Sequence, residues 1–96
     1  MSTLKLLQLI KDNQEDFLVS TNRRMATSTG NKHYHESMSF FLVKRDYRAI
    51  EEMLTDEWYH KALEGVIVCM NMYCGTSSQV ISNMMNALEE LRNEPY

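Results

Sequence analysis

The sequence is poor in the residues that interrupt helices. Its 96 residues include one proline, Pro95, and only three glycines. Proline removes a backbone hydrogen-bond donor and glycine carries a high conformational entropy cost, so both usually mark the ends of helices. Their scarcity, together with the absence of any repeat or low-complexity tract, predicts a mostly helical chain. The length suits one domain, so residues 1–96 are expected to form a single helical domain.

Cysteine is also scarce. The two cysteines, Cys69 and Cys74, are five positions apart in an apolar stretch. On a helix they would point about 140° apart, which is a poor geometry for a disulfide. A chain without a disulfide framework suits a reducing compartment, and we expect a cytoplasmic protein.

Long apolar segments are missing as well. The longest uninterrupted apolar runs are 40–43 and 66–70, far below the roughly 20 residues that cross a bilayer. The beginning of the chain is apolar but lacks a basic opening and leads into acidic residues. We therefore interpret it as a helix rather than a signal peptide, and we expect no membrane partner.

The apolar residues that are present recur at spacings of three and four, which places them on one face of a helix. This predicts an all-α fold, with a dimer as an alternative for so small a domain. A polar loop is expected at 27–33, and the first helix has an alternative end at the polar stretch 12–16. The expected elements form a small bundle of three to four helices, at about 3–24, 34–54, 56–74 and 78–92.

The second of these helices carries the most regular apolar face. Charged residues lie between the apolar ones and are expected to face water. The residues expected to face the core follow one another at intervals of 3, 4, 3 and 4: Phe40, Val43, Tyr47, Ile50 and Leu54.

Local signals mark the ends of the last two helices. Thr55 suits the start of the third helix, and Gly75 suits its end because glycine adopts the left-handed conformation without a steric cost. The segment 76–79 has the spacing of a capping box for the fourth helix. The segment 66–70 is expected to belong to the most buried helix, although its β-branched residues leave a short buried strand as an alternative.

Charge is distributed unevenly along the chain, whose net charge is −3. Residues 23–48 include six basic and two acidic residues, whereas residues 49–96 include two basic and eight acidic ones. A basic middle segment beside an acidic half suggests a surface that attracts an acidic partner, or two complementary halves that meet in a dimer. Ordinary solvated faces explain the same pattern equally well.

The basic segment also suits an anionic ligand. Arginine and lysine bind phosphate, and an aromatic ring can stack on a base. The alternative function is therefore binding of a nucleic acid or a phosphorylated small molecule. A duplex binder would usually show more cations and a positive net charge, which argues against DNA. The candidate anion-binding residues are Arg23, Arg24, Lys32, His33 and Tyr34.

Motifs of catalysis and metal binding are missing. The sequence has no glycine-rich phosphate loop, no Gly-x-Ser-x-Gly turn and no His-Glu-x-x-His. Cys69 and Cys74 do not have a usual zinc spacing, and they lie where apolar surroundings make thiols inert. We therefore expect no catalytic residue, no metal ion and no cofactor, and a protein that is not an enzyme.

Methionine is abundant, with eight residues in the chain. Its flexible thioether lines adaptable binding surfaces, although it also fills gaps in a core. A domain of this size has only a small core, and its basic middle segment lies beside an acidic half. Together with the abundance of methionine, these features favour a small non-enzymatic helical interaction protein, such as an adaptor, inhibitor or chaperone. Such a protein would bind a protein partner and self-associate as a homo-oligomer. The apolar stripe expected to bind the partner lies on the fourth helix: Ile81, Met84, Met85 and Leu88.

Overall fold

The computed structural model describes residues 2–94, and all regular structure within that range is helical. The prediction of an all-α fold is confirmed, but the predicted number of three to four helices is wrong, because six α-helices and one 3-10 turn are present in the described part of the chain. In chain order they are α1 (Ser2–Asp12), α2 (Gln14–Thr27), α3 (Lys32–Lys44), α4 (Tyr47–Leu54), η1 (Glu57–Tyr59), α5 (His60–Cys74) and α6 (Ser78–Asn93).

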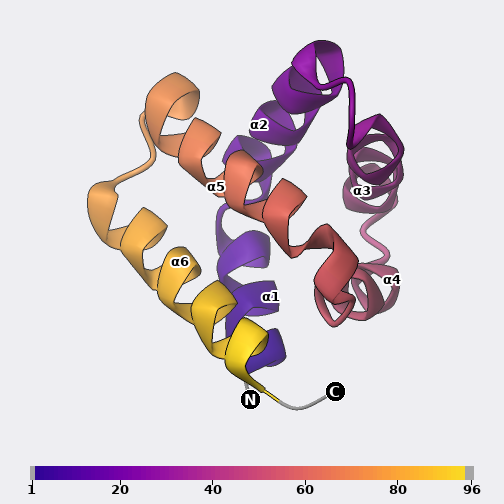
Figure 1. Cartoon of the computed structure of the whole chain (residues 1–96). Coiled ribbons are helices and arrows are strands. Elements are labelled where there is room, and N and C mark those ends of the chain that lie inside the picture. Colours follow the sequence, from indigo (N-terminus) through magenta and orange to yellow (C-terminus); the bar gives the residue numbers. More distant parts are fainter. Residues whose placement is uncertain (1, 95–96) are drawn as a thin grey trace.

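The helices pack around a shared set of buried apolar side chains. In Figure 1, α5 crosses in front of α2, and α1 and α6 run side by side. To the right of them, α3 packs against α2, and α4 follows below it and packs against α1 and α3. Every α-helix contributes to this core. Its large members that are fully buried include Leu6, Ile10, Phe17, Met38, Leu42, Ile50, Leu63, Ile67, Met70 and Met84.

The first predicted helix ends at the polar stretch 12–16, which the sequence left open as an alternative. Asn13 separates α1 from α2. Its backbone N–H and its side-chain amide both donate to the Leu9 carbonyl, at 3.1 and 2.9 Å. An asparagine that bonds the last turn of a helix in this way competes with the continuing backbone, so it ends α1.

The second predicted helix, 34–54, is wrong as a continuous element because it breaks at Arg45 and Asp46. Arg45 adopts a left-handed conformation, with φ 54°. Its N–H donates to the Leu42 carbonyl, and the N–H of Asp46 donates to the Phe41 carbonyl, which is the hydrogen-bond pattern of a Schellman motif. The Asp46 carboxylate then accepts from the Ala49 N–H at 3.2 Å and caps α4.

This break changes which residues face the core. An uninterrupted helix would keep 40, 43, 47, 50 and 54 on one face, but the left-handed turn at Arg45 resets the direction of the chain. Ile50 and Leu54 are buried as expected, whereas Phe40 and Val43 are 58% and 64% exposed, so their predicted burial is wrong. The buried face of α3 is formed instead by Tyr34, His35, Met38 and Leu42.

The remaining boundaries follow local capping. Thr55 ends α4 rather than starting the next helix, and Asp56 caps η1 by accepting from the Trp58 N–H at 3.0 Å. Residues 66–70 lie within α5, so this segment is helical and not a strand. Gly75 ends α5 at φ 68°, as predicted. Ser77, one residue after the start of the predicted capping box, caps α6 by accepting from the Val80 N–H.

Both cysteines are half-buried thiols, and no disulfide joins them, as their spacing predicts. Within residues 2–94 no helix combines the length and the apolar character needed to cross a membrane. The loop after α2 runs from residue 28 to residue 31.

Candidate functional site

The five predicted anion-binding residues do not converge on one site. Lys32 and His33 are exposed at the start of α3. Tyr34, in contrast, is buried in the core, where its ring centroid lies 4.9 Å from that of Tyr59. Burial raises the pKa of the Tyr34 hydroxyl, which therefore stays protonated at neutral pH and offers no charge.

Arg23 and Arg24 are the two predicted residues that the fold does bring together. Both project from the C-terminal half of α2 toward α5, and they line a pocket of about 190 Å³. The Arg23 guanidinium carbon lies 4.7 Å from the centroid of the Tyr73 ring, a cation–π contact that joins the two helices. We call this pocket the α2–α5 pocket, and its other lining residues are Ala26, Thr27, Cys69 and Tyr73.

Arg24 reaches its position because Gly65 has no side chain. A Cβ at residue 65 would lie 3.1 Å from both Nε and Nη2 of Arg24, so the guanidinium covers the bare backbone of α5. The Arg24 Nε is buried and has no hydrogen-bond acceptor among residues 2–94. Neither Arg23 nor Arg24 forms an ion pair with a described carboxylate.

His35 is a buried imidazole close to this pair of helices. The sequence suggested a surface histidine here and did not place it among the candidate site residues. It is 0% exposed, and neither ring nitrogen has a hydrogen-bond partner in the described chain. Burial, and secondarily the positive charge of Arg24, lower the pKa of His35 to about 4. His35 is therefore neutral at pH 7 and does not add to the positive charge of the α2–α5 pocket.

The α6 stripe that was predicted to bind a partner packs against this chain's own helices. Met84 and Leu88 are 0% exposed, and Ile81 and Met85 are partly buried against the core. Met84 and Leu88 therefore offer no surface in this fold. Of the seven methionines in the described range, Met72 alone is strongly exposed.

The outer face of α3 carries the apolar surface that the sequence interpretation placed inside. Phe40 and Val43 lie one turn apart on this face, and more than half of the surface of each residue is accessible to solvent. Lys44 follows directly, with its Nζ 5.9 Å from the centroid of the Phe40 ring, and Arg45 comes next. We call Phe40, Val43, Lys44 and Arg45 the α3 patch. The signal that could have found it is Asp46, a good N-cap residue three positions before Ala49.

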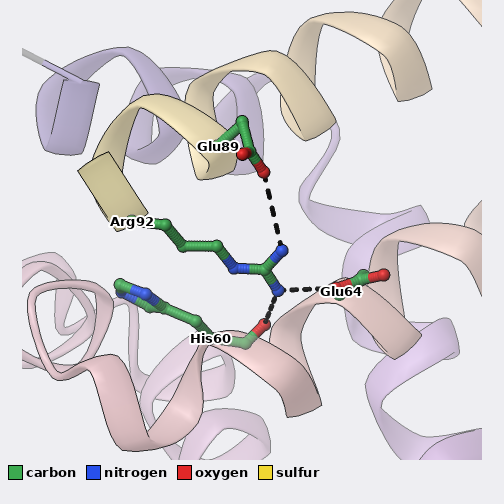
Figure 2. Close-up of polar contacts among 4 residues, drawn as sticks. All are labelled: His60, Glu64, Glu89 and Arg92. Atoms are coloured by element: carbon green, nitrogen blue, oxygen red, sulfur yellow. Dashed lines mark hydrogen bonds and ion pairs between the residues drawn. The ribbon is translucent and has the colours of Figure 1, made fainter.

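A third feature joins the C-terminal helix to α5. Figure 2 shows Arg92 of α6 between Glu64 and Glu89, with its Nη2 also donating to the His60 carbonyl at 3.4 Å. A cleft of about 590 Å³ lies beside it, with Trp58 79% exposed among the lining residues. Because two carboxylates already compensate Arg92, this arrangement serves mainly to hold α6 against α5.

Within residues 2–94 no three histidine, cysteine, aspartate or glutamate side chains lie close enough together to hold a metal ion. Comparison of the chain with protein-family models, with curated proteins and with solved structures finds no match.

Proposed function

We propose that this protein is a small helical interaction protein that binds an acidic protein partner through the α3 patch. The observation that carries the proposal is the exposure of Phe40 and Val43 beside Lys44 and Arg45. An apolar centre with cations at its edge has the layout of a protein-binding surface, in which aromatic residues supply most of the affinity.

Burial of apolar side chains and attraction between charges both favour binding at the α3 patch. Complete burial of a phenylalanine or valine side chain contributes about 1.5–3 kcal/mol each. Lys44 and Arg45 form no ion pair within the described residues, so both cations remain available to a partner. Unpaired cations at the rim of an interface steer an acidic partner into place and raise the association rate.

The backbone at Arg45 supports the same assignment. The left-handed position after a helix is usually occupied by glycine, as it is at Gly75, because other residues are strained there. Arg45 keeps a long cationic side chain at this position, despite the cost in stability. Residues that hold strained conformations are concentrated at functional sites.

The α3 patch suits a protein partner better than a nucleic acid. Glu36 and Asp46 lie on or next to the same surface, and the whole chain is acidic, with a net charge of −3. Nucleic-acid binding depends on neutralising several phosphates, and a surface on which acidic residues lie among the cations does this poorly. The acidic half of a second copy of this chain could occupy the α3 patch instead of another protein. Crosslinking distinguishes these two partners.

The test is site-specific photo-crosslinking in cells of the protein's own host. The photoreactive residue p-benzoylphenylalanine replaces Phe40, and in a matched control it replaces Trp58, an exposed aromatic residue outside the patch. We expect a discrete acidic protein crosslinked at position 40, absent at position 58 and lost when Lys44→Glu and Arg45→Glu are added. A crosslink to a second copy of this chain, or identical products at both positions, would refute the proposal.

A further inference from the structure

We propose that the α2–α5 pocket binds a small phosphate-bearing anion, either inorganic phosphate or a small phosphate monoester. This site lies between α2 and α5 and is separate from the α3 patch, so it goes beyond the proposed function. Arg23 and Arg24 supply the charge, and Gly65 makes room for one of them.

Neither arginine of the α2–α5 pocket has a compensating carboxylate among residues 2–94. Arginine stays protonated at all relevant pH values and usually meets a carboxylate when it is partly buried. The acids nearest in sequence on the two helices, Glu64 on α5 and Asp16 on α2, are engaged elsewhere. Glu64, next to Gly65, binds Arg92, and Asp16 accepts a hydrogen bond from Thr76 at 2.8 Å. Arg24 and Arg23 are therefore left for a ligand.

The Nε of Arg24 is buried and has no hydrogen-bond acceptor in the described chain. A buried donor without an acceptor costs free energy that is recovered when an acceptor arrives. The Nε–H and the neighbouring Nη–H groups of a guanidinium form a fork that matches two oxygens of a phosphate. The guanidinium packs on the backbone of α5 at Gly65, and this contact places it at the edge of the pocket.

The size and lining of the pocket suit a small phosphate-bearing ligand. A volume of about 190 Å³ admits a phosphate with a few further atoms, but not a nucleic-acid duplex. Ala26 and the ring of Tyr73 give the pocket an apolar wall, which suits a small organic group on the phosphate. Because Arg23 is packed on the Tyr73 ring, its guanidinium is already positioned and loses little freedom on binding.

The experiment is a titration of the whole protein, labelled with ¹⁵N, with inorganic phosphate and with phenyl phosphate at low salt. The Arg24 side-chain Nε–H signal reports the site, and isothermal calorimetry gives the affinity. Benzoate, which has the same ring and a carboxylate, is the ligand control. We expect saturable binding of one or both phosphates, with shifts centred on Arg24 and Arg23, and at least tenfold weaker binding of benzoate.

Variants make the test specific. Arg24→Gln removes a charge-assisted donor pair and should weaken binding about tenfold or more, whereas Arg45→Gln, which removes the same charge from the α3 patch, should leave the affinity unchanged within about twofold. Gly65→Ala displaces the Arg24 guanidinium while retaining every charge, and should also weaken binding if Arg24→Gln perturbs folding. Absence of saturable shifts at Arg24, equal weakening by Arg45→Gln, or benzoate binding as tightly as phenyl phosphate would overturn the proposal.

Discussion

The guanidinium of Arg24 occupies the space that a side chain on Gly65 would fill. A Cβ at residue 65 would lie 3.1 Å from Arg24 Nε and Nη2 and 3.2 Å from Cζ, so three atoms of the group cover one point of α5. Close by, the Ser20 hydroxyl donates to the Val66 carbonyl. In both contacts a side chain of α2 lies directly on the backbone of α5, so the two helices are held close together.

Gly65→Ala tests this contact in two backgrounds. Alanine favours a helix over glycine by about 1 kcal/mol, but in the wild-type chain the new methyl group must displace Arg24. We expect the gain in the free energy of unfolding to be smaller in the wild type than in an Arg24→Ala background, by about 0.5 kcal/mol or more. Urea denaturation of the four proteins measures the difference. The same gain in both backgrounds would show that Arg24 does not lie over Gly65.

Substitutions at Phe40 and Leu42 test the direction in which α3 faces. Phe40 is mostly exposed, so Phe40→Ser should change the free energy of unfolding by about 0.5 kcal/mol or less. Leu42 is fully buried, so Leu42→Ala should lower it by about 2–5 kcal/mol. Chemical denaturation of both variants checks the pair. A large loss of stability in Phe40→Ser with a small loss in Leu42→Ala would instead support the continuous helix 34–54 that the sequence predicts.

Arg45→Gly should stabilise the protein because glycine relieves the left-handed strain at φ 54°. The expected gain in the free energy of unfolding is about 0.5–1 kcal/mol, after the extra entropy of the unfolded glycine is subtracted. Arg45→Ala is the matched control, since it removes the same cation but keeps the strain. Thermal melts should separate the two variants, and a glycine variant no more stable than the alanine variant would contradict the prediction.

His35 makes the stability of the protein depend on pH. Its pKa is lowered from 6.5 to about 4 in the fold, so the unfolded chain binds the proton more readily. Stability is complete above the unfolded pKa and is lost as the pH falls from 6.5 toward 4. We expect a loss of roughly 2 kcal/mol between pH 7 and pH 5.

This loss should be absent in His35→Leu and retained in His33→Gln, because His33 is exposed. Urea denaturation at both pH values provides the comparison. If wild type and His35→Leu have the same pH dependence, His35 is not buried in its neutral form.

Arg92 should hold the end of α6 against α5. Arg92→Ala removes two ion pairs and the bond to the His60 carbonyl, and should lower the free energy of unfolding by about 1 kcal/mol. Glu89→Gln should have a much smaller effect, since the Glu89 carboxylate lies 3.7 Å from Nη1 and is more exposed than Glu64. Hydrogen exchange of the last turn of α6 gives the local readout, and equal effects of the two variants would argue against this role.

Features that depend on neighbouring residues could be predicted from the sequence. The helical content follows from the apolar spacing and the scarcity of proline and glycine. The end of α5 at Gly75 follows from the conformational freedom of glycine, and the lack of a disulfide follows from the spacing of Cys69 and Cys74. Each of these has a cause within a turn or two of helix, so a single sequence contains the necessary information.

The candidate sites depended on contacts between distant parts of the chain. The apolar spacing from Phe40 to Leu54 fits one uninterrupted helix, although Asp46 is a local sign of a break. The packing of α4 against α1 and α3 decides that Phe40 and Val43 stay outside the core. Methionine at 84 has the same sequence character whether it faces a partner or the core. Packing against the neighbouring helices buries it.

The helical character of the chain and the ends of several helices follow from local backbone preferences, so they can be inferred from the amino-acid order alone. Which apolar residues reach the surface and which cations remain unpaired depends on how the helices dock. Arg24 illustrates the reason: its neighbours along α2 do not indicate that it will lie on Gly65, or that Arg92 will engage the nearby Glu64. Such pairings arise when separate helices dock, and they follow from the complete packing arrangement rather than from any one segment.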